Sequence, residues 1–216
     1  MQQHHCHLRV ENFIFEGPAG KLEGLFESQQ DSVSVASAVI CHPHPLHGGT
    51  LYNKVVYTLA RAFIRQQFNV LRFNFRGTGQ SEGEYGDEQG ELLDACAAIR
   101  WVQEREPDLP IWLAGFSFGA VITIHASLET KLEGLISIAP AVSRCSNHID
   151  SQPDCPWLII HGDQDELVNI DAIVEWLNKL EPGPALSVFQ DTTHFFHGKL
   201  GLLRQTVESF VKDNRA

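Results

Sequence analysis

The sequence predicts an α/β protein built on a mainly parallel, doubly wound sheet with helices on both faces. Apolar runs of strand length alternate with amphipathic segments of helix length along the chain, a pattern typical of βαβ crossovers and a parallel sheet. Several of these runs are almost continuously apolar, as expected for strands that are buried on both faces. The first two strands are separated by a short turn, so they should form an antiparallel hairpin at one edge of the sheet.

Each element follows from a local pattern. A Pro-Ala-Gly turn joins the hairpin strands at 11–17 and 20–27. In the helix predicted at 53–67 the apolar residues share one face and Asn53 can cap the start, and the helix at 87–105 has acidic residues where its dipole favours them. Further helices are expected at 117–129, 169–180 and 200–213. Further strands are expected at 36–42, 69–75, 109–116, 132–139, 156–162 and 185–190.

Length and composition indicate one globular domain with a sizeable core. The chain has 216 residues and a net charge of −11, so it lacks the basic surface that nucleic acid or an anionic membrane would require. No apolar run is long enough to span a bilayer, and the five cysteines are scattered, which is typical of reduced cytoplasmic thiols. We expect a flexible N-terminus at 1–8, a single domain at 9–216 and a cytoplasmic location. The sequence does not indicate the oligomeric state.

The strongest motif is "GFSFG", which places Ser117 between Gly115 and Gly119 where an apolar strand becomes a helix. A serine nucleophile on such a sharp turn needs strained backbone angles and very small residues two positions away on each side. The helix that follows points its first amides toward a developing oxyanion, and the N–H of Phe118 is the natural first donor.

Two weaker signals follow other strands. "HGDQDELV" places Asp163 and Asp165 after one strand, and "TTHFF" places His194 after the next. A carboxylate at a strand end can orient a histidine, and the histidine can take the proton of a serine. The ligand site of a doubly wound sheet lies at the carboxyl ends of its strands, and Ser, Asp, His is a chain order known for hydrolases built on such sheets. The pattern favours Ser117, Asp165 and His194 as a catalytic triad.

Two other stretches suggest different chemistry. "VICHPHPLHGG" holds Cys41, His42, His44 and His47, which could bind a metal if the side chains converged. The glycines of "RGTGQSEG" resemble a dinucleotide fingerprint, but their spacing is off by one and acidic residues follow. We therefore expect no cofactor and no resident metal, and interpret the glycine-rich stretch as a turn packed beneath the active site.

With these motifs in this order, the chain resembles the α/β-hydrolase superfamily over nearly its full length. It is most similar to a small bacterial subgroup of predicted serine hydrolases near the dienelactone hydrolases. Only about sixteen residues separate "LISIA" from "PWLII", where larger relatives insert a lid, so a lidless enzyme is expected.

The resemblance implies Ser117 as nucleophile, His194 as base and Asp165, at the acid position of an "HGxxDxxV" pattern, as its partner. The loop after "AVICH" supplies the second oxyanion amide in such hydrolases. Because Pro43 and Pro45 have no N–H, the amide of His44 is the best candidate there, and that of Leu46 is the second. Leu46, Phe116 and Phe195 are candidates for the substrate pocket.

The expected activity is hydrolysis of a carboxylic ester, or a related thioester or peptide bond, in a small-molecule acyl substrate through an acyl-enzyme. The alternatives are a metal-dependent hydrolase that uses the cluster at 41–47 and a non-catalytic binding protein that has kept the fold.

Overall fold

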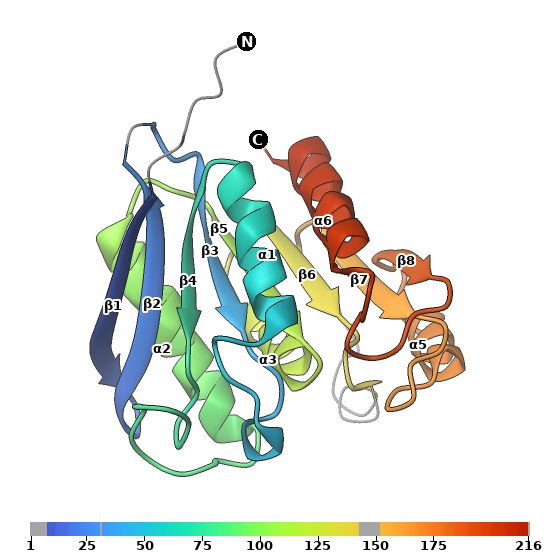
Figure 1. The fold of residues 1–216 in the computed structure, drawn as a ribbon, viewed down its shortest axis with the longest axis horizontal. Helices are drawn as coiled ribbons and strands as arrows, with labels where there is room; N and C mark the ends of the chain where they lie inside the picture. Colours follow the sequence, from blue (N-terminus) through green and yellow to red (C-terminus); the bar gives the residue numbers. More distant parts are fainter. Residues whose placement is uncertain (1–7, 31, 143–151, 216) are drawn as a thin grey trace.

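A computed structural model describes residues 8–30, 32–142 and 152–215 of the chain (Figure 1). One eight-stranded sheet has the order β1-β2-β4-β3-β5-β6-β7-β8. Strands β1 and β2 form the antiparallel hairpin, β2 pairs antiparallel with β4, and all pairs from β4 to β8 are parallel. The predicted fold class is confirmed, including the antiparallel strands at one edge.

The element boundaries lie within a few residues of those expected from the sequence. The strands are β1 Leu8–Gly17, β2 Gly20–Gln29, β3 Ala36–Cys41, β4 Phe68–Phe73, β5 Ile111–Phe116, β6 Gly134–Ile138, β7 Trp157–Gly162 and β8 Ala185–Phe189. The α-helices are α1 Lys54–Arg65, α2 Gln89–Arg105, α3 Phe118–Glu129, α5 Ile170–Leu177 and α6 Leu200–Asn214. A short 3₁₀ helix, η1, covers Pro45–His47.

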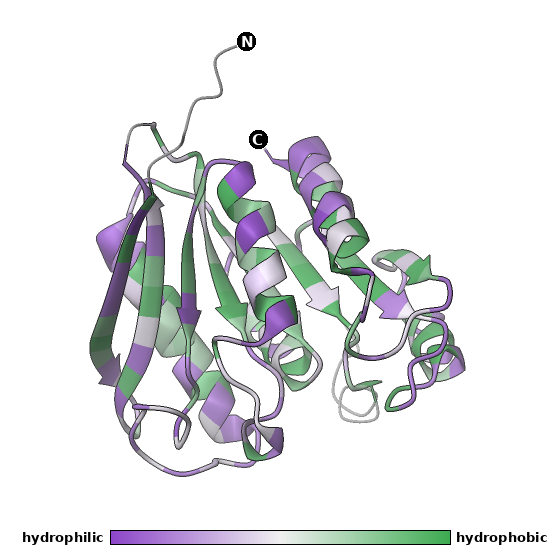
Figure 2. Ribbon diagram, viewed as in Figure 1, coloured by the Kyte–Doolittle hydropathy of each residue, from purple (hydrophilic) through white to green (hydrophobic). Residues whose placement is uncertain are grey.

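Two hydrophobic layers enclose the sheet. Helices α1 and α6 pack on one face, where buried side chains include Phe63 and Val207, and α2, α3 and α5 pack on the other, where they include Val121 and Trp176 (Figure 1). Figure 2 shows that the central strands are mostly hydrophobic, whereas α1 and α6 alternate between hydrophilic and hydrophobic residues. This is the pattern of helices with one face on a core and one in water.

Three further expectations concern the N-terminus, the stretch without a lid and membrane-spanning helices. Strand β1 begins at Leu8 rather than at residue 11, so the last residue of the predicted flexible terminus is already in the sheet. Residues 1–7, and residues 143–151 of the stretch expected to lack a lid, lie outside the described residues. In the part that the structure describes, no helix has the length and apolarity needed to cross a membrane.

The parallel strands end along one edge of the sheet, and this edge carries the candidate site. Cys41 at the end of β3 lies beside Gly115 of β5, and Gly162 at the end of β7 lies beside Phe189 of β8. The loops that follow these strands therefore meet over the end of β5, which is a central strand. The glycine-rich turn at 76–83 follows β4 and contacts the hairpin, since Lys21 and Glu82 are joined through backbone and side-chain hydrogen bonds.

Candidate active site

Ser117 lies in a strained turn between β5 and α3. Its φ of 55° and ψ of −114° are unusual for a residue with a side chain. Its N–H donates to the carbonyl of Ile138, 2.8 Å away, which anchors the turn to β6. A Cβ on Gly115 would collide with the backbone of Gly119, and a Cβ on Gly119 would collide with the carbonyl of His42. Glycine is therefore required at both positions.

Ser117, His194 and Asp165 form one hydrogen-bonded chain. His194 Nε2 is 3.0 Å from Ser117 Oγ, and His194 Nδ1 is 2.7 Å from Asp165 Oδ2. The His194 residue is only 2% exposed, so water competes little for these bonds. Burial by itself would raise the pKa of Asp165, but the hydrogen bonds from His194 and the backbone N–H of Val168 outweigh burial and lower this pKa. Asp165 therefore stays ionised and faces the imidazole.

The loop that carries Asp165 folds back so that its backbone N–H groups donate to the Asp165 carboxylate. Oδ1 accepts the backbone N–H groups of Leu167 and Val168 at 2.9 and 2.8 Å. Asp163 makes a different contact, because its Oδ1 accepts the N–H of Thr192 at 3.2 Å. Asp163 thus joins the loop after β7 to the loop after β8, and Asp165 alone of the two faces His194.

A second histidine lies against the same carboxylate, and sequence reasoning did not identify it. His161, at the end of β7, donates from Nε2 to the carbonyl of Val168 at 2.8 Å, and the same nitrogen is 3.5 Å from Asp165 Oδ2. Its Nδ1 is buried and has no hydrogen-bond partner among the described residues. Burial lowers the pKa of His161, so the ring remains neutral and supports the Asp165 loop as a donor.

The loop after β3 packs directly against the serine turn. A Cβ on Gly119 would collide with the carbonyl oxygen of His42 and lie only 2.5 Å from that of Cys41. The buried His42 ring donates from Nδ1 to the carbonyl of Pro43 at 2.6 Å and accepts the N–H of Phe75 at Nε2, 3.1 Å away. Burial lowers the pKa of His42 to about 4. The neutral ring therefore joins the loop after β3 to the loop after β4.

Two backbone amides near the serine turn are the expected oxyanion donors. Phe118 is the first residue of α3, where backbone N–H groups have no partner within the helix. His44 lies in the loop after β3, immediately before η1. Further along this loop, Leu51 donates its N–H to Asn74 Oδ1 at 2.8 Å, and its carbonyl accepts from Arg72 Nη1 at 3.0 Å. The loop is thus held by buried contacts at both ends.

The side chains of the histidine cluster at 41–47 are not arranged as a set of convergent metal ligands in this structure. Both ring nitrogens of His42 are engaged by the backbone, and His44 Nδ1 accepts the N–H of Leu46. Cys41 is buried, and burial holds the pKa of its thiol well above the usual value. Among residues 8–30, 32–142 and 152–215, no three His, Cys, Asp or Glu side chains lie where they could share an ion. These contacts give no support to the alternative based on this cluster.

The three expected pocket residues have different surroundings. Leu46 is 67% exposed and Phe195 is 43% exposed, and the Phe195 ring centroid is 5.2 Å from that of His194. Phe116 is completely buried in the layer beneath α1 and α6. Its ring supports His194 from the core side at 5.1 Å, so the expectation that Phe116 lines the pocket was wrong.

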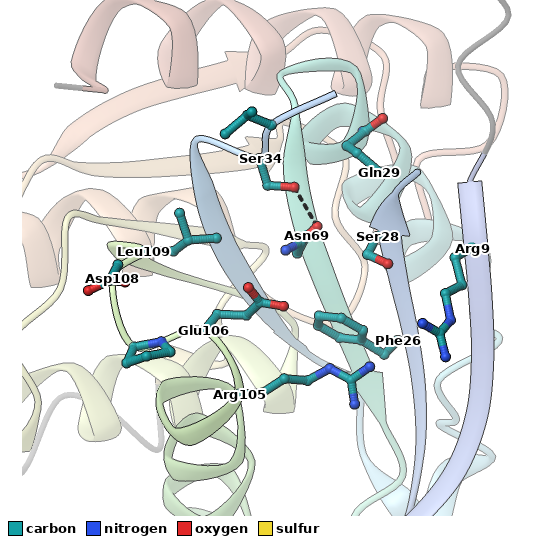
Figure 3. Close-up of a pocket in the computed structure, with 12 residues that line it drawn as sticks. Arg9, Phe26, Ser28, Gln29, Ser34, Asn69, Arg105, Glu106, Asp108 and Leu109 are labelled. Atoms are coloured by element: carbon teal, nitrogen blue, oxygen red, sulfur yellow. Dashed lines mark hydrogen bonds between the residues drawn. The ribbon is translucent and has the colours of Figure 1, made fainter. Parts of the chain in front are cut away.

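A separate hollow of about 430 Å³ lies near the amino end of β4, and Figure 3 shows the residues that line it, which do not include Ser117. Its polar groups largely bond to neighbouring side chains. Ser34 donates to Asn69 at 2.6 Å, and Arg105 is bonded to Glu11 while it stacks over Phe26. The hollow holds no serine–histidine contact and is not the candidate active site.

A strained serine above a central parallel strand, with a histidine and a carboxylate supplied by later strands, is the arrangement of α/β serine hydrolases. The model of the family described as serine aminopeptidase, S33, matches residues 39–153. The chain belongs to this family. The match includes Ser117 and the loop at 41–47 and ends before Asp165 and His194.

Three relatives match nearly the whole length of the chain. An α/β serine hydrolase homologue from Coxiella burnetii is 40% identical with a TM-score of 0.88, and the match covers 92% of this chain and 96% of that one. An α/β serine hydrolase without lid from Xanthomonas campestris is 38% identical with a TM-score of 0.90, covering 95% and 94%. An uncharacterized protein of Rickettsia prowazekii is 31% identical over 212 residues, covering 94% of this chain and 89% of that protein. The chain is a small α/β hydrolase of the bacterial type, and the link to dienelactone hydrolases remains a prediction.

Proposed function

We propose that this protein hydrolyses a carboxylic ester, or a related acyl bond, through an acyl-enzyme formed on Ser117. The observation that carries the proposal is the continuous contact from Ser117 Oγ to His194 Nε2 at 3.0 Å and from His194 Nδ1 to Asp165 Oδ2 at 2.7 Å. A serine hydroxyl is a weak nucleophile unless a neighbouring base takes its proton, and this arrangement supplies the base.

The reaction would proceed in two halves. His194 Nε2 accepts the hydroxyl proton while Ser117 Oγ forms a bond to the substrate carbonyl carbon. The protonated Nε2 then donates this proton to the leaving oxygen as its bond to carbon breaks, which leaves an acyl-serine. In the second half, water gives a proton to His194 and attacks the acyl carbon, and the same proton returns to Ser117 as the acid departs.

The Asp165 carboxylate would determine which imidazole nitrogen carries the proton. Because Oδ2 accepts from Nδ1, the neutral ring presents an unprotonated Nε2 to the serine. When Nε2 takes the serine proton, the ionised carboxylate stabilises the imidazolium. The buried His161 and the amides of Leu167 and Val168 keep this carboxylate in place.

The charge on the carbonyl oxygen would be stabilised by the backbone N–H groups of Phe118 and His44. Donors that are already oriented need no rearrangement when the charge develops, which is why such sites lower the barrier strongly. The contacts of His42 and Leu51 hold the loop that carries the His44 amide.

The proposed substrate is a small acyl compound, with an ester favoured over a thioester or peptide bond. We also propose that the protein acts in the cytoplasm, without a nucleic-acid or membrane partner and without a cofactor. The acidic composition supports this, and Cys41, Cys96 and Cys155 are free thiols in the described part of the chain.

The test is covalent labelling with a fluorophosphonate probe, followed by turnover of two substrates. These are p-nitrophenyl acetate and the arylamide of an amino acid with a free amino group. Wild type should be labelled and Ser117→Ala should not, whereas Ser209→Ala, which removes an exposed hydroxyl on α6, should behave as wild type. Equal labelling of wild type and Ser117→Ala would contradict the proposal. Turnover of the arylamide alone would favour a peptidase over an esterase.

A further inference from the structure

Four aromatic rings meet beside the serine turn and form what we call the ring cluster, made up of His44, His47, Tyr85 and Phe118. The His44 ring lies at its centre. Its centroid is 4.5 Å from His47 in a stacked arrangement, 5.1 Å from Tyr85 and 4.7 Å from Phe118. These spacings are those of favourable aromatic contacts. No periodic pattern in the sequence points to this group, because its members come from three separate loops or helix ends.

The ring cluster extends from the core to the surface. Phe118 is buried, His44 and Tyr85 are half-buried, and His47 is exposed. Two of the four rings belong to His44 and Phe118, whose backbone amides are the proposed oxyanion donors. A substrate whose carbonyl oxygen reaches these amides therefore has one of its two substituents next to the rings.

The strand order indicates which substituent this is. His44 and Tyr85 follow β3 and β4, which lie on one side of β5, whereas His194 and Phe195 follow β8, on the other side. His194 must reach the leaving oxygen in order to protonate it. The leaving group therefore lies toward His194 and Phe195, and the acyl group lies toward the ring cluster.

We propose that the ring cluster is the acyl subsite and that it selects flat aromatic acyl groups. This proposal rests on the proposed function, since it assumes that Ser117 is acylated. Imidazole and phenol rings present π-faces on which another ring can stack. Such a surface offers an aliphatic chain less contact than a wall of Leu or Ile side chains would.

The experiment compares two substrates that differ only in aromaticity, p-nitrophenyl phenylacetate and p-nitrophenyl cyclohexylacetate. Both have the same leaving group and an unconjugated carbonyl, and each kcat/KM is divided by the rate constant for hydroxide hydrolysis. At about pH 8, where ordinary imidazoles are neutral, wild type should prefer the phenylacetyl ester by roughly twofold to tenfold, the range that one aromatic pair contributes.

Variants locate the origin of this preference. His47→Leu and Tyr85→Leu remove a ring and keep an apolar side chain, so each should bring the ratio of the two kcat/KM values close to one. Tyr52→Leu removes an exposed tyrosine outside the cluster and should keep both the activity and the ratio of wild type. Phe195 lies on the leaving-group side, so Phe195→Leu should leave the ratio of the two kcat/KM values unchanged even if it changes both rates.

A wild-type ratio of one or less would overturn the proposal, as would a ratio that His47→Leu and Tyr85→Leu leave unchanged. Either result is distinct from failure of the proposed function, because fluorophosphonate labelling and acetyl ester turnover report on Ser117 independently of the acyl group. Thermal melts of both leucine variants show whether a changed ratio comes from folded protein.

Discussion

Replacing Asp165 with asparagine tests the site most sharply, because the structure determines how the new amide must lie. Oδ1 of Asp165 accepts two backbone N–H groups, those of Leu167 and Val168. An asparagine must keep its oxygen at this place, since an NH₂ group cannot accept these bonds. Its NH₂ group then occupies the position of Oδ2, which is 2.7 Å from His194 Nδ1.

A donor at that position reverses the histidine tautomer. Nδ1 must become the acceptor, so the proton moves to Nε2 and points at Ser117 Oγ, which can no longer transfer its own proton to the ring. An Asp-to-Asn change of this kind lowers turnover about 10⁴-fold in a serine protease triad, equivalent to about 5 kcal/mol in the barrier. We expect a loss of this order for Asp165→Asn.

Asp163→Asn is the matched control. Its side-chain oxygen can still accept the N–H of Thr192, as Asp163 Oδ1 does at 3.2 Å, so turnover should change less than about tenfold and stability by about 1 kcal/mol. Turnover of p-nitrophenyl acetate at saturation is measured for both variants, with thermal melts to show folding. A folded Asp165→Asn enzyme that keeps more than a tenth of the wild-type turnover would refute the reasoning, as would an inactive, folded Asp163→Asn enzyme.

Three further outcomes are expected. Burial lowers the pKa of His42 from 6.5 to about 4 in the folded protein. As the pH falls from 6.5 to 4, His42 is therefore protonated in the unfolded chain but not in the folded one. Wild type should therefore lose up to about 3 kcal/mol of stability across this range, a loss that His42→Gln should remove. Urea unfolding at several pH values measures this, and an equal pH dependence in both proteins would count against it. His161→Leu should lower kcat about tenfold by releasing the carbonyl of Val168, and His161→Gln, whose amide can donate there, should restore most of the rate; equal rates in both would show that this bond does not matter. Dialysis against EDTA should leave ester hydrolysis intact, and a loss that zinc reverses would revive the metal alternative.

The arrangement of strands and helices could be predicted because each buried face leaves a periodic pattern. Continuous apolar runs such as β5 and β7, and the one-sided pattern of α1, located the elements to within a few residues. Topology predicted that Ser117, Asp165 and His194 would lie at one edge of the sheet, since the carboxyl ends of parallel strands meet there, whereas the choice of Asp165 over Asp163 came from the resemblance. The contacts themselves depend on loop conformations that no periodicity encodes.

What sequence reasoning missed or misplaced has physical causes. Phe116 is still part of β5, so its side chain follows the pleat into the core beneath α1 and α6 instead of turning outward with Ser117. His161 looked like the last residue of a strand, and only its contacts with Val168 and Asp165 show that it supports the Asp165 loop. Tyr85 lies 32 positions before Ser117, and only the paths of the loops after β3 and β4 bring its ring to His44.

The strand order also separates the two sides of the site along the chain. Every residue proposed on the acyl side precedes or immediately follows Ser117, whereas His194 and Phe195 come from the last third of the chain. Recombination between relatives within β6 would therefore exchange one half of the substrate specificity without touching the other. A chimaera of two such hydrolases should inherit its acyl preference from one parent and its leaving-group preference from the other, so this topology lets new specificities arise by crossover as well as by point mutation.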